Sequence, residues 1–148
     1  MLWKTLIDLL DSGFIRASSS LAAALVLFVR KPGSGLYFCC DYRALNEIML
    51  RDRYPLPLIT ETLCSVAKAR WFTKLDIVAA FHKLYMAKGY EYKTAFRMHF
   101  GSFEWMVCPF GLSSTPASFQ CYINSIIQDF GEWAIAYLDD ILIFTDRL

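Results

Sequence analysis

The run AIAYLDDILIFT, residues 134–145, places two adjacent acidic side chains, Asp139 and Asp140, inside an otherwise apolar stretch. Burying an ionised carboxylate without a partner is costly, so the two acids must face water, a cation or a turn. The flanking segments 134–138 and 141–145 are rich in β-branched and aromatic residues, which favour strands. The pattern therefore predicts a β-hairpin with a tight turn at Asp139 and Asp140.

The rest of the chain alternates short helical and strand patterns. The predicted elements are, in chain order, a helix over 3–13, a hairpin over 24–41 with its turn at 32–35, a helix within 53–69, a strand ending at Asp76, a short helix, a hairpin over 93–107 with Gly101 in its turn, a helix with Pro116 in its first turn, and the final hairpin. The helix after Pro116 carries an apolar stripe, most of which is expected to be core: Phe119, Ile123, Ile126, Ile127 and Phe130. This mixture of antiparallel hairpins and helices predicts an α+β fold.

Composition narrows the class of protein. A chain of 148 residues is expected to form one domain, and its five cysteines are odd in number with no CxxC pair, which is typical of reduced intracellular thiols. The longest apolar run, residues 21–29, is too short to cross a bilayer, so neither a membrane span nor a targeting signal is expected. The first half of the chain is basic and the second half acidic, which suits a polyanion held near a metal, although ordinary surface variation gives the same split.

A third carboxylate changes the meaning of the acidic pair. On their own, Asp139 and Asp140 are equally well explained as turn residues. Asp76, however, also ends an apolar strand, and carboxylates at the ends of neighbouring strands can converge on hard cations such as Mg²⁺. Two such ions can activate a 3′-hydroxyl and stabilise a leaving pyrophosphate. The three aspartates therefore indicate a candidate site for phosphoryl transfer.

Six motifs in one order carry a family resemblance. They are VRKPGSGLYFCCDYRALNE, DRYPLPLI, WFTKLDIVAAFHKL, YKTAFR, FGSFEWMVCPFGLSSTPASFQ and YLDDILIFT. Over about residues 5–146 the chain resembles the reverse transcriptase of Gypsy-type long-terminal-repeat retrotransposons. The resemblance implies an RNA-directed DNA polymerase with fingers at roughly 14–70 and a palm at roughly 71–148, whose antiparallel sheet is backed by helices. It also implies dNTPs and an RNA or DNA template–primer as partners, and protease, RNase H and integrase regions in a full polyprotein that acts in a cytoplasmic particle or the nucleus.

The resemblance also assigns roles to individual residues. Asp76, Asp139 and Asp140 match the catalytic aspartates that bind Mg²⁺, or Mn²⁺ in its place, with Asp76 and Asp139 as principal ligands. Phe81 matches the aromatic residue that excludes a ribose 2′-hydroxyl, and its alternative is a core aromatic on a short helix. The remaining nucleotide-binding candidates are Arg30, Lys31, Tyr37, Phe110 and Gly111, and the template or primer candidates are Arg43, Pro116, Gln120 and Tyr137. For Arg30 and Lys31 the alternative is a solvated hairpin tip.

Two departures from the family pattern leave a second interpretation open. Tyr37 stands where these reverse transcriptases usually carry an arginine that contacts the triphosphate, and tyrosine supplies no charge. The expected thumb, which clamps the duplex, has no counterpart in the sequence. The alternative is therefore a truncated, non-enzymatic retroelement remnant with residual nucleic-acid binding. A third candidate, an aspartic-protease half-site at LLDSGF, is weak because Phe14 occupies a position that needs a small residue.

Overall fold

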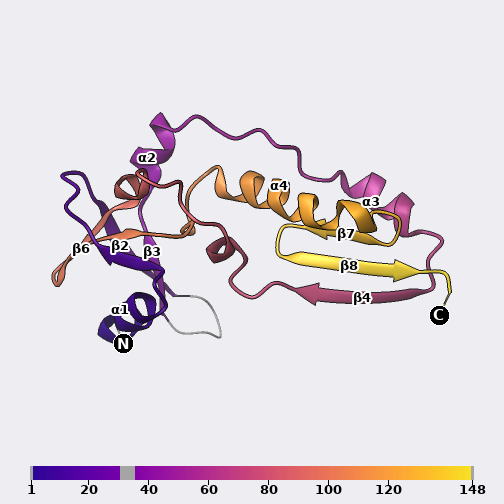
Figure 1. Cartoon of the computed structure of the whole chain (residues 1–148), viewed down its shortest axis with the longest axis horizontal. Helices are drawn as coiled ribbons and strands as arrows, with labels where there is room; N and C mark the ends of the chain where they lie inside the picture. The colour runs from indigo at the N-terminus through magenta and orange to yellow at the C-terminus, as the bar shows by residue number, and fades with distance from the viewer. Residues whose placement is uncertain (1, 31–35, 148) are drawn as a thin grey trace. The chain divides into compact units, whose positions relative to one another are not determined.

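The computed structural model describes residues 2–30 and 36–147 (Figure 1). The chain divides into two compact units, each assembled from two segments of sequence. The first unit comprises Met1–Leu50 and Phe81–Thr115, and the second comprises Arg51–Ala80 and Pro116–Leu148. Each unit has its own β-sheet. The α+β class expected from the sequence is confirmed, whereas the boundary between fingers and palm stays a prediction.

The first unit is built around a five-stranded sheet with the strand order β1-β6-β5-β2-β3. Its elements are α1 (Leu2–Asp11), β1 (Ile15–Ala17), β2 (Ala24–Arg30), β3 (Leu36–Cys40), α2 (Arg43–Ile48), the 3-10 helices η1 (Ala80–Lys83, which starts at the end of the second unit) and η2 (Glu91–Thr94), β5 (Phe96–Met98) and β6 (Gly101–Trp105). Both predicted hairpins, β2–β3 and β5–β6, are antiparallel, and β2 and β5 join them in parallel. The predicted turn at 32–35 lies outside the described residues.

The core of the first unit lies between this sheet and the helices. Its buried members are Leu6, Ile15, Cys40, Tyr42, Phe96, Trp105, Val107 and Leu112. Leu6 belongs to the apolar face of α1, whose helical spacing the sequence shows. Strand β1 and helix α2 were not expected from the sequence, because elements of three and six residues leave too little periodicity to detect.

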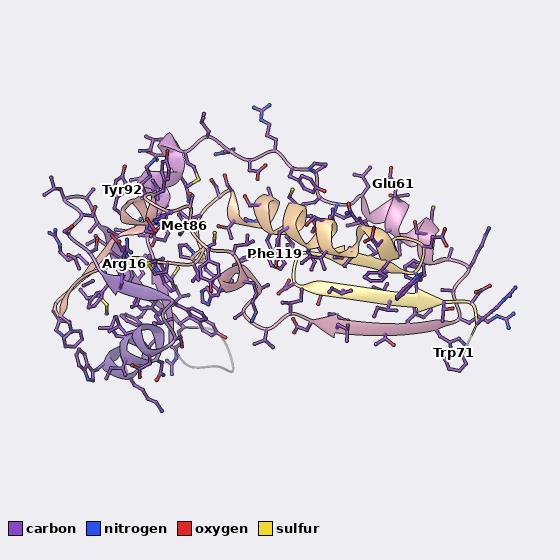
Figure 2. The ribbon with its side chains drawn as sticks, viewed as in Figure 1. Arg16, Glu61, Trp71, Met86, Tyr92 and Phe119 are labelled. Atoms are coloured by element: carbon purple, nitrogen blue, oxygen red, sulfur yellow. The ribbon has the colours of Figure 1, made fainter. Side chains whose placement is uncertain are left out.

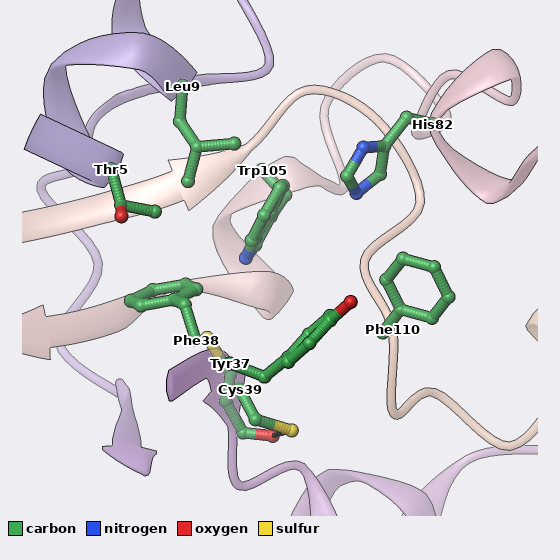
Figure 3. A pocket seen from close by; sticks show the side chains of 9 residues that line it. Thr5, Leu9, Tyr37, Phe38, Cys39, His82, Trp105 and Phe110 are labelled. Atoms are coloured by element: carbon green, nitrogen blue, oxygen red, sulfur yellow. Dashed lines mark hydrogen bonds between the residues drawn. The ribbon is translucent and has the colours of Figure 1, made fainter. Parts of the chain in front are cut away.

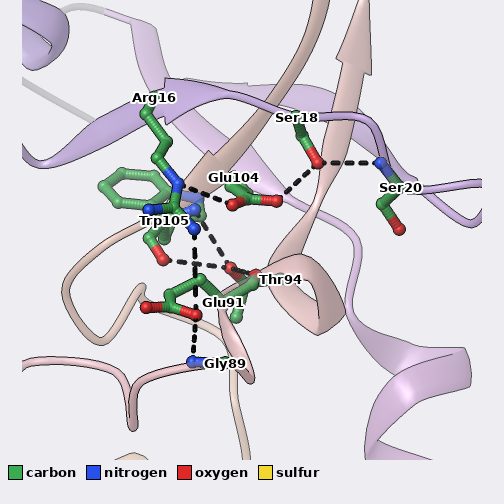
Figure 4. Close-up of polar contacts among 8 residues, drawn as sticks. All are labelled: Arg16, Ser18, Ser20, Gly89, Glu91, Thr94, Glu104 and Trp105. Atoms are coloured by element: carbon green, nitrogen blue, oxygen red, sulfur yellow. Dashed lines mark hydrogen bonds and ion pairs between the residues drawn. The ribbon is translucent and has the colours of Figure 1, made fainter.

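A buried carboxylate ties β1 to β6 (Figure 4). Glu104 accepts a hydrogen bond from Arg16 Nε at 2.7 Å and another from Ser18 Oγ at 2.6 Å. Arg16 and Glu104 are also direct cross-strand partners in the sheet. Because each carboxylate oxygen of Glu104 has a donor, its negative charge is satisfied inside the unit.

Thr94 links η2 to the end of β6 (Figure 4). The side chain is fully buried, its hydroxyl donates to the Glu91 carbonyl at 2.7 Å, and its oxygen accepts the Trp105 backbone N–H at 3.0 Å. Glu91 in turn accepts the Gly89 backbone N–H at 2.7 Å. One hydroxyl therefore satisfies two backbone groups that have no place in the sheet ladder.

Replacing Thr94 with valine is expected to lower the free energy of unfolding by about 1–3 kcal/mol. Valine keeps the shape of the side chain but leaves the buried Trp105 N–H without an acceptor. Urea unfolding of both proteins measures the difference. Thr73→Val, at an exposed position, is the matched control and should change stability by less than about 0.5 kcal/mol. Equal stabilities for the two variants would contradict this role.

The second unit is a three-stranded antiparallel sheet with helices (Figure 1). Its elements are α3 (Ile59–Val66), β4 (Trp71–Asp76), α4 (Thr115–Ile127), the 3-10 helix η3 (Gln128–Phe130), β7 (Ala134–Tyr137) and β8 (Asp140–Thr145). The strand order is β4-β8-β7, so β8 is central, and α4 runs beside β7. This is the antiparallel sheet backed by helices that the family resemblance implies.

The turn between β7 and β8 differs from the prediction. Its two residues are Leu138 and Asp139, while Asp140 is already the first residue of β8 and pairs with Tyr137. Leu138 adopts a φ of 53°, an uncommon conformation for a residue with a branched side chain. The shift by one residue places Asp140 in the sheet and Asp139 in the turn, so the two acids have different surroundings.

The apolar stripe on α4 is only partly buried. Phe119 and Ile123 are core residues, Ile127 is half-buried, and Ile126 and Phe130 are exposed. Only two of the five predicted residues are buried, so the prediction that most of the stripe is core was wrong. Apolar spacing shows which face of a helix is apolar, but it does not show how much of that face other elements cover.

Candidate active site

Asp76 and Asp140 face each other across the β4–β8 pair. They are direct cross-strand partners, and the Ile77 N–H next to them donates to the Asp139 carbonyl at 2.8 Å. This bond makes Asp76 and Asp140 a non-hydrogen-bonded pair, in which side chains of antiparallel strands approach most closely. Two like charges in that position destabilise a sheet. Such a pair needs a compensating cation.

Lys74 provides a positive charge on the same face of the sheet. It precedes Asp76 by two residues, and its Nζ lies 3.0 Å from Asp140 Oδ1. The hydrogen bond and charge of Asp140, followed by the charges of Asp76 and Asp139, raise the pKa of Lys74. The field of all three carboxylates therefore acts on one cation position. Sequence reasoning missed Lys74, although a lysine two residues before Asp76 on a predicted strand was a usable signal.

The donor chemistry at this position fits a hard divalent cation. Carboxylate oxygens are the ligands that Mg²⁺ and Mn²⁺ prefer. The raised pKa of Lys74 shows that the negative charges of these aspartates stabilise a cation at this position. Within residues 2–30 and 36–147, however, no three His, Cys, Asp or Glu side chains already form a group that could hold a metal ion. The assignment of Asp76, Asp139 and Asp140 as metal ligands thus stays a prediction.

Removing the charge of Lys74 is expected to make the thermal stability of the second unit more dependent on divalent cations. We expect Lys74→Met to lower the melting temperature of the chain in EDTA, because Asp76 and Asp140 then face each other uncompensated. Mg²⁺ should raise the melting temperature of the variant more than that of the unmodified chain. Lys68→Met, at another exposed lysine, is the control. If Mg²⁺ raises the melting temperature of all three proteins equally, Lys74 and a metal ion do not compete for the same carboxylates.

Gln120 supports the turn that carries Asp139. It is fully buried, its Nε2 donates to the Ala136 carbonyl at 2.9 Å, and its Oε1 accepts the Leu138 N–H at 2.8 Å. Both backbone groups lie on β7 and its turn, on the strand edge that faces away from β8. The Gln120 amide also bonds Asn124 at 2.8 Å. The predicted contact of Gln120 with template or primer stays a prediction, and the structure shows that its side chain holds the turn that carries Asp139.

The other residues predicted to touch template or primer are accessible to different degrees. Pro116 lies in the first turn of α4, as expected, and Tyr137 ends β7 with its side chain exposed. Arg43, at the start of α2, makes two hydrogen bonds to the Asp41 carboxylate, at 2.9 and 2.7 Å. This guanidinium lowers the pKa of Asp41 to about 2.

Several predicted nucleotide-binding residues come together in the first unit. Tyr37 on β3 and Phe110 after β6 line one cavity (Figure 3), and the Phe110 ring lies 5.1 Å from that of Phe81. Gly111 has a φ of 100°, which favours glycine, and a Cβ there would meet the Cys40 carbonyl at 3.5 Å.

The polypeptide beside Gly111 is held by a side chain that sequence reasoning missed. Asn46 donates to the Gly111 carbonyl at 2.8 Å and accepts the Ser113 N–H at 2.9 Å. Of the two predicted cations, Arg30 is exposed at the end of β2, whereas Lys31 lies outside the described residues. All these residues belong to the first unit, and the three aspartates belong to the second.

Comparisons with known proteins agree on one family. The model of the reverse transcriptase (RNA-dependent DNA polymerase) family matches residues 29–148. The Tf2-3 transposon polyprotein of Schizosaccharomyces pombe is 43% identical over 135 residues, which cover 90% of this chain and 10% of the polyprotein. The Tf2-7 polyprotein of the same organism is 42% identical over the same share. The chain thus spans about a tenth of the length of these curated relatives.

Solved structures agree on the fold. The foamy viral protease–reverse transcriptase in complex with an RNA/DNA hybrid superposes with a TM-score of 0.88 at 21% identity, over 99% of this chain and 20% of that one. A second structure of the foamy viral enzyme, with double-stranded DNA, gives a TM-score of 0.88 at 22% identity and covers 99% of this chain and 26% of that one.

No helix in the described part of the chain is long and apolar enough to cross a membrane. The chain belongs to the reverse transcriptase family.

Proposed function

We propose that this chain carries the catalytic centre of an RNA-directed DNA polymerase, which transfers a dNTP to the 3′-hydroxyl of a primer. The observation that carries the proposal is the cross-strand pairing of Asp76 with Asp140, with Asp139 in the adjoining turn. Membership of the reverse transcriptase family supports the same reaction. We further propose that the domain works within a retrotransposon polyprotein that includes protease, RNase H and integrase regions, in a cytoplasmic particle or the nucleus.

The three aspartates would hold the divalent cations. Asp76 and Asp139 would be the principal ligands of Mg²⁺, or of Mn²⁺ in its place, and Asp140 would support them. Bound there, the ions would activate the primer 3′-hydroxyl and stabilise the charge of the leaving pyrophosphate. The protein's own contribution is rigidity: β4 and β8 fix the separation of Asp76 and Asp140, and Gln120 fixes the turn that carries Asp139.

The first unit would supply the binding surface for the incoming nucleotide. Phe81 would exclude a ribose 2′-hydroxyl by its bulk, and Gly111 would let the backbone approach the substrate. Tyr37 and Phe110 would offer aromatic surface, while Arg30 and Lys31 would attract the triphosphate. Arg43, Pro116, Gln120 and Tyr137 remain our candidates for contact with an RNA or DNA template–primer.

Primer extension on an RNA template tests the proposal. We expect incorporation of dNTPs with Mg²⁺ or Mn²⁺ and none in EDTA. Signals at background under all conditions would reject the polymerase proposal for this chain and favour the non-enzymatic remnant, which Tyr37 in place of the family's arginine supports. Template–primer binding, measured in the same samples by fluorescence anisotropy, would then show whether nucleic-acid binding survives.

Phe81→Ala is expected to raise the incorporation of ribonucleotides relative to deoxynucleotides by about 10-fold or more. Removing the ring opens the space that a 2′-hydroxyl needs, and the neighbouring Phe110 ring, 5.1 Å away, loses this one contact. Competitive incorporation of rNTP and dNTP measures the ratio. Phe100→Ala, at an exposed phenylalanine of the same unit, should leave the ratio unchanged. If Phe81→Ala leaves the ratio unchanged as well, Phe81 is a packing residue and not a gate for the sugar.

A further inference from the structure

A network of hydrogen bonds links the segment before α3, residues 51–58, to the turn between β7 and β8. Helix α4 lies between this segment and β7 (Figure 2). The Oε1 atom of Gln120 accepts the Leu138 N–H at 2.8 Å, and its Nε2 donates to Asn124 Oδ1 at 2.8 Å. Asn124 Nδ2 in turn donates to the Tyr54 hydroxyl oxygen at 3.0 Å. All four residues belong to the second unit.

The direction of every bond in this network is fixed from the turn outward. Gln120 presents its oxygen to the Leu138 N–H and one amide hydrogen to the Ala136 carbonyl, 2.9 Å away. The second amide hydrogen goes to the oxygen of Asn124, so Asn124 directs its own NH₂ group toward Tyr54. The Tyr54 hydroxyl is therefore the acceptor that ends the network, and a phenylalanine in its place could not accept this bond.

Tyr54 is held in place for this contact by a second connection to α4. Its backbone N–H donates to Asp52 Oδ1 at 3.0 Å, and Asp52 Oδ2 accepts the Ser118 hydroxyl at 2.9 Å. Tyr54 is half-buried, whereas the residues on either side of it are exposed. Its hydroxyl is thus fixed against α4 by bonds to two different residues of that helix.

The turn at the other end of the network needs this support. Leu138 has a φ of 53°, which is strained for a residue other than glycine, and such a conformation persists only where its surroundings hold it. Gln120 is fully buried, so water does not compete for the Leu138 N–H. Asp139, one of the three proposed metal ligands, follows Leu138 directly. A rotation of the Gln120 amide would therefore change the direction of the Asp139 carboxylate.

We propose that Tyr54 and Asn124 are positioning residues for the polymerase reaction. They act through the Gln120 amide, which fixes the turn that carries Asp139. The inference rests on the proposed function and deepens it, because it assigns a rate effect to two residues outside the proposed metal ligands and nucleotide contacts. Since the bonds act in series, breaking one of them should remove the effect of those farther from the turn.

Steady-state primer extension by the full chain and a double-mutant cycle test the proposal. Tyr54→Phe deletes only the hydroxyl, and we expect it to lower kcat about 3- to 10-fold with little change in the KM for dNTP, because it disturbs the metal site and not the nucleotide surface. In an Asn124→Ala background, Tyr54→Phe should have no further effect on kcat. Tyr122→Phe is the matched control, since it removes the hydroxyl of an exposed tyrosine on α4. Equal effects of Tyr54→Phe in both backgrounds, or equal kcat values for Tyr54→Phe and Tyr122→Phe, would overturn the proposal.

Hydrogen exchange separates this inference from the polymerase proposal, because it needs neither substrate nor metal. The reference is the Phe144 N–H, which bonds the Trp133 carbonyl and reports opening of the sheet. Relative to it, the Leu138 N–H should exchange about 10-fold faster in Tyr54→Phe than in the unmodified chain, and at an unchanged rate in Tyr122→Phe. If the unmodified chain extends no primer, the proposed function fails, and the exchange comparison still decides whether the network holds the turn. An unchanged relative rate in Tyr54→Phe would overturn the inference even where primer extension is normal.

Discussion

Replacing Asp139 with asparagine is expected to slow primer extension by about 10³-fold, which corresponds to a loss of about 4 kcal/mol of transition-state stabilisation. The substitution removes one carboxylate charge from the proposed metal site. It leaves the fold intact, because the side chain of Asp139 is exposed in the turn and the bond to the Ile77 N–H uses only its backbone carbonyl. The loss should therefore appear in the rate and not in the melting temperature.

The matched control for this experiment is Asp129→Asn. Asp129 is exposed in η3, in the same unit, and the substitution makes the same change in charge. Its rate should stay within a factor of about two of the unmodified chain, since it lies outside the three proposed ligands. Equal extension rates for Asp139→Asn and Asp129→Asn would show that the acidic pair does not support catalysis.

Replacing Gln120 with leucine is expected to lower the free energy of unfolding by about 2–5 kcal/mol. The apolar side chain would fill the same space but leave the Ala136 carbonyl and the Leu138 N–H without partners. Each unsatisfied buried group costs about 1–3 kcal/mol. The turn that carries Asp139 would also lose its support, so primer extension should fall more than the fraction of folded protein does.

Urea unfolding and primer extension on the same preparations measure the two effects of Gln120→Leu. Gln128→Leu is the control, because Gln128 is exposed in η3 and its side chain supports no strand edge. Unchanged stability in Gln120→Leu would mean that the buried amide is not needed at the edge of β7. Lost stability with a normal rate per folded molecule would limit the role of Gln120 to the fold.

Local sequence patterns predicted most elements of the second unit. Pro116 marked the start of α4, and β-branched residues marked β7 and β8, because these signals act within a few residues. The exact turn was missed by one residue. A positive φ at Leu138 is imposed by the pairing of Tyr137 with Asp140 and is disfavoured by leucine itself, so no local preference indicates it.

Local sequence patterns could not predict the register between strands that are far apart in the sequence. Asp76 and Asp140 belong to strands far apart in sequence, and only the β4–β8 register shows that their side chains are direct partners. The compensating position of Lys74 follows from the same register. The family resemblance predicted which aspartates matter, but it did not indicate Lys74 or the supporting role of Gln120.

The cavity lined by Tyr37 and Phe110 in the first unit could not be inferred from sequence for a similar reason. Leu9, His82 and Trp105 come from three separate elements and share a wall only after the sheet and α1 have packed. In the sequence, His82 was a single histidine with no ligand at metal-binding spacing, so a partly buried polar role was its natural interpretation. Among the described residues, the buried Nε2 of His82 has no hydrogen-bond partner, which periodicity cannot reveal.

The most direct test of the central claim is Mn²⁺ binding, followed by water-proton relaxation in the absence of nucleic acid. If Asp76, Asp139 and Asp140 form one cation site, the unmodified chain should enhance relaxation, Asp76→Asn should weaken Mn²⁺ binding by at least about 10-fold, and Asp129→Asn should not weaken it. Identical Mn²⁺ affinities in the unmodified chain and Asp76→Asn would contradict the claim that these aspartates meet around a cation.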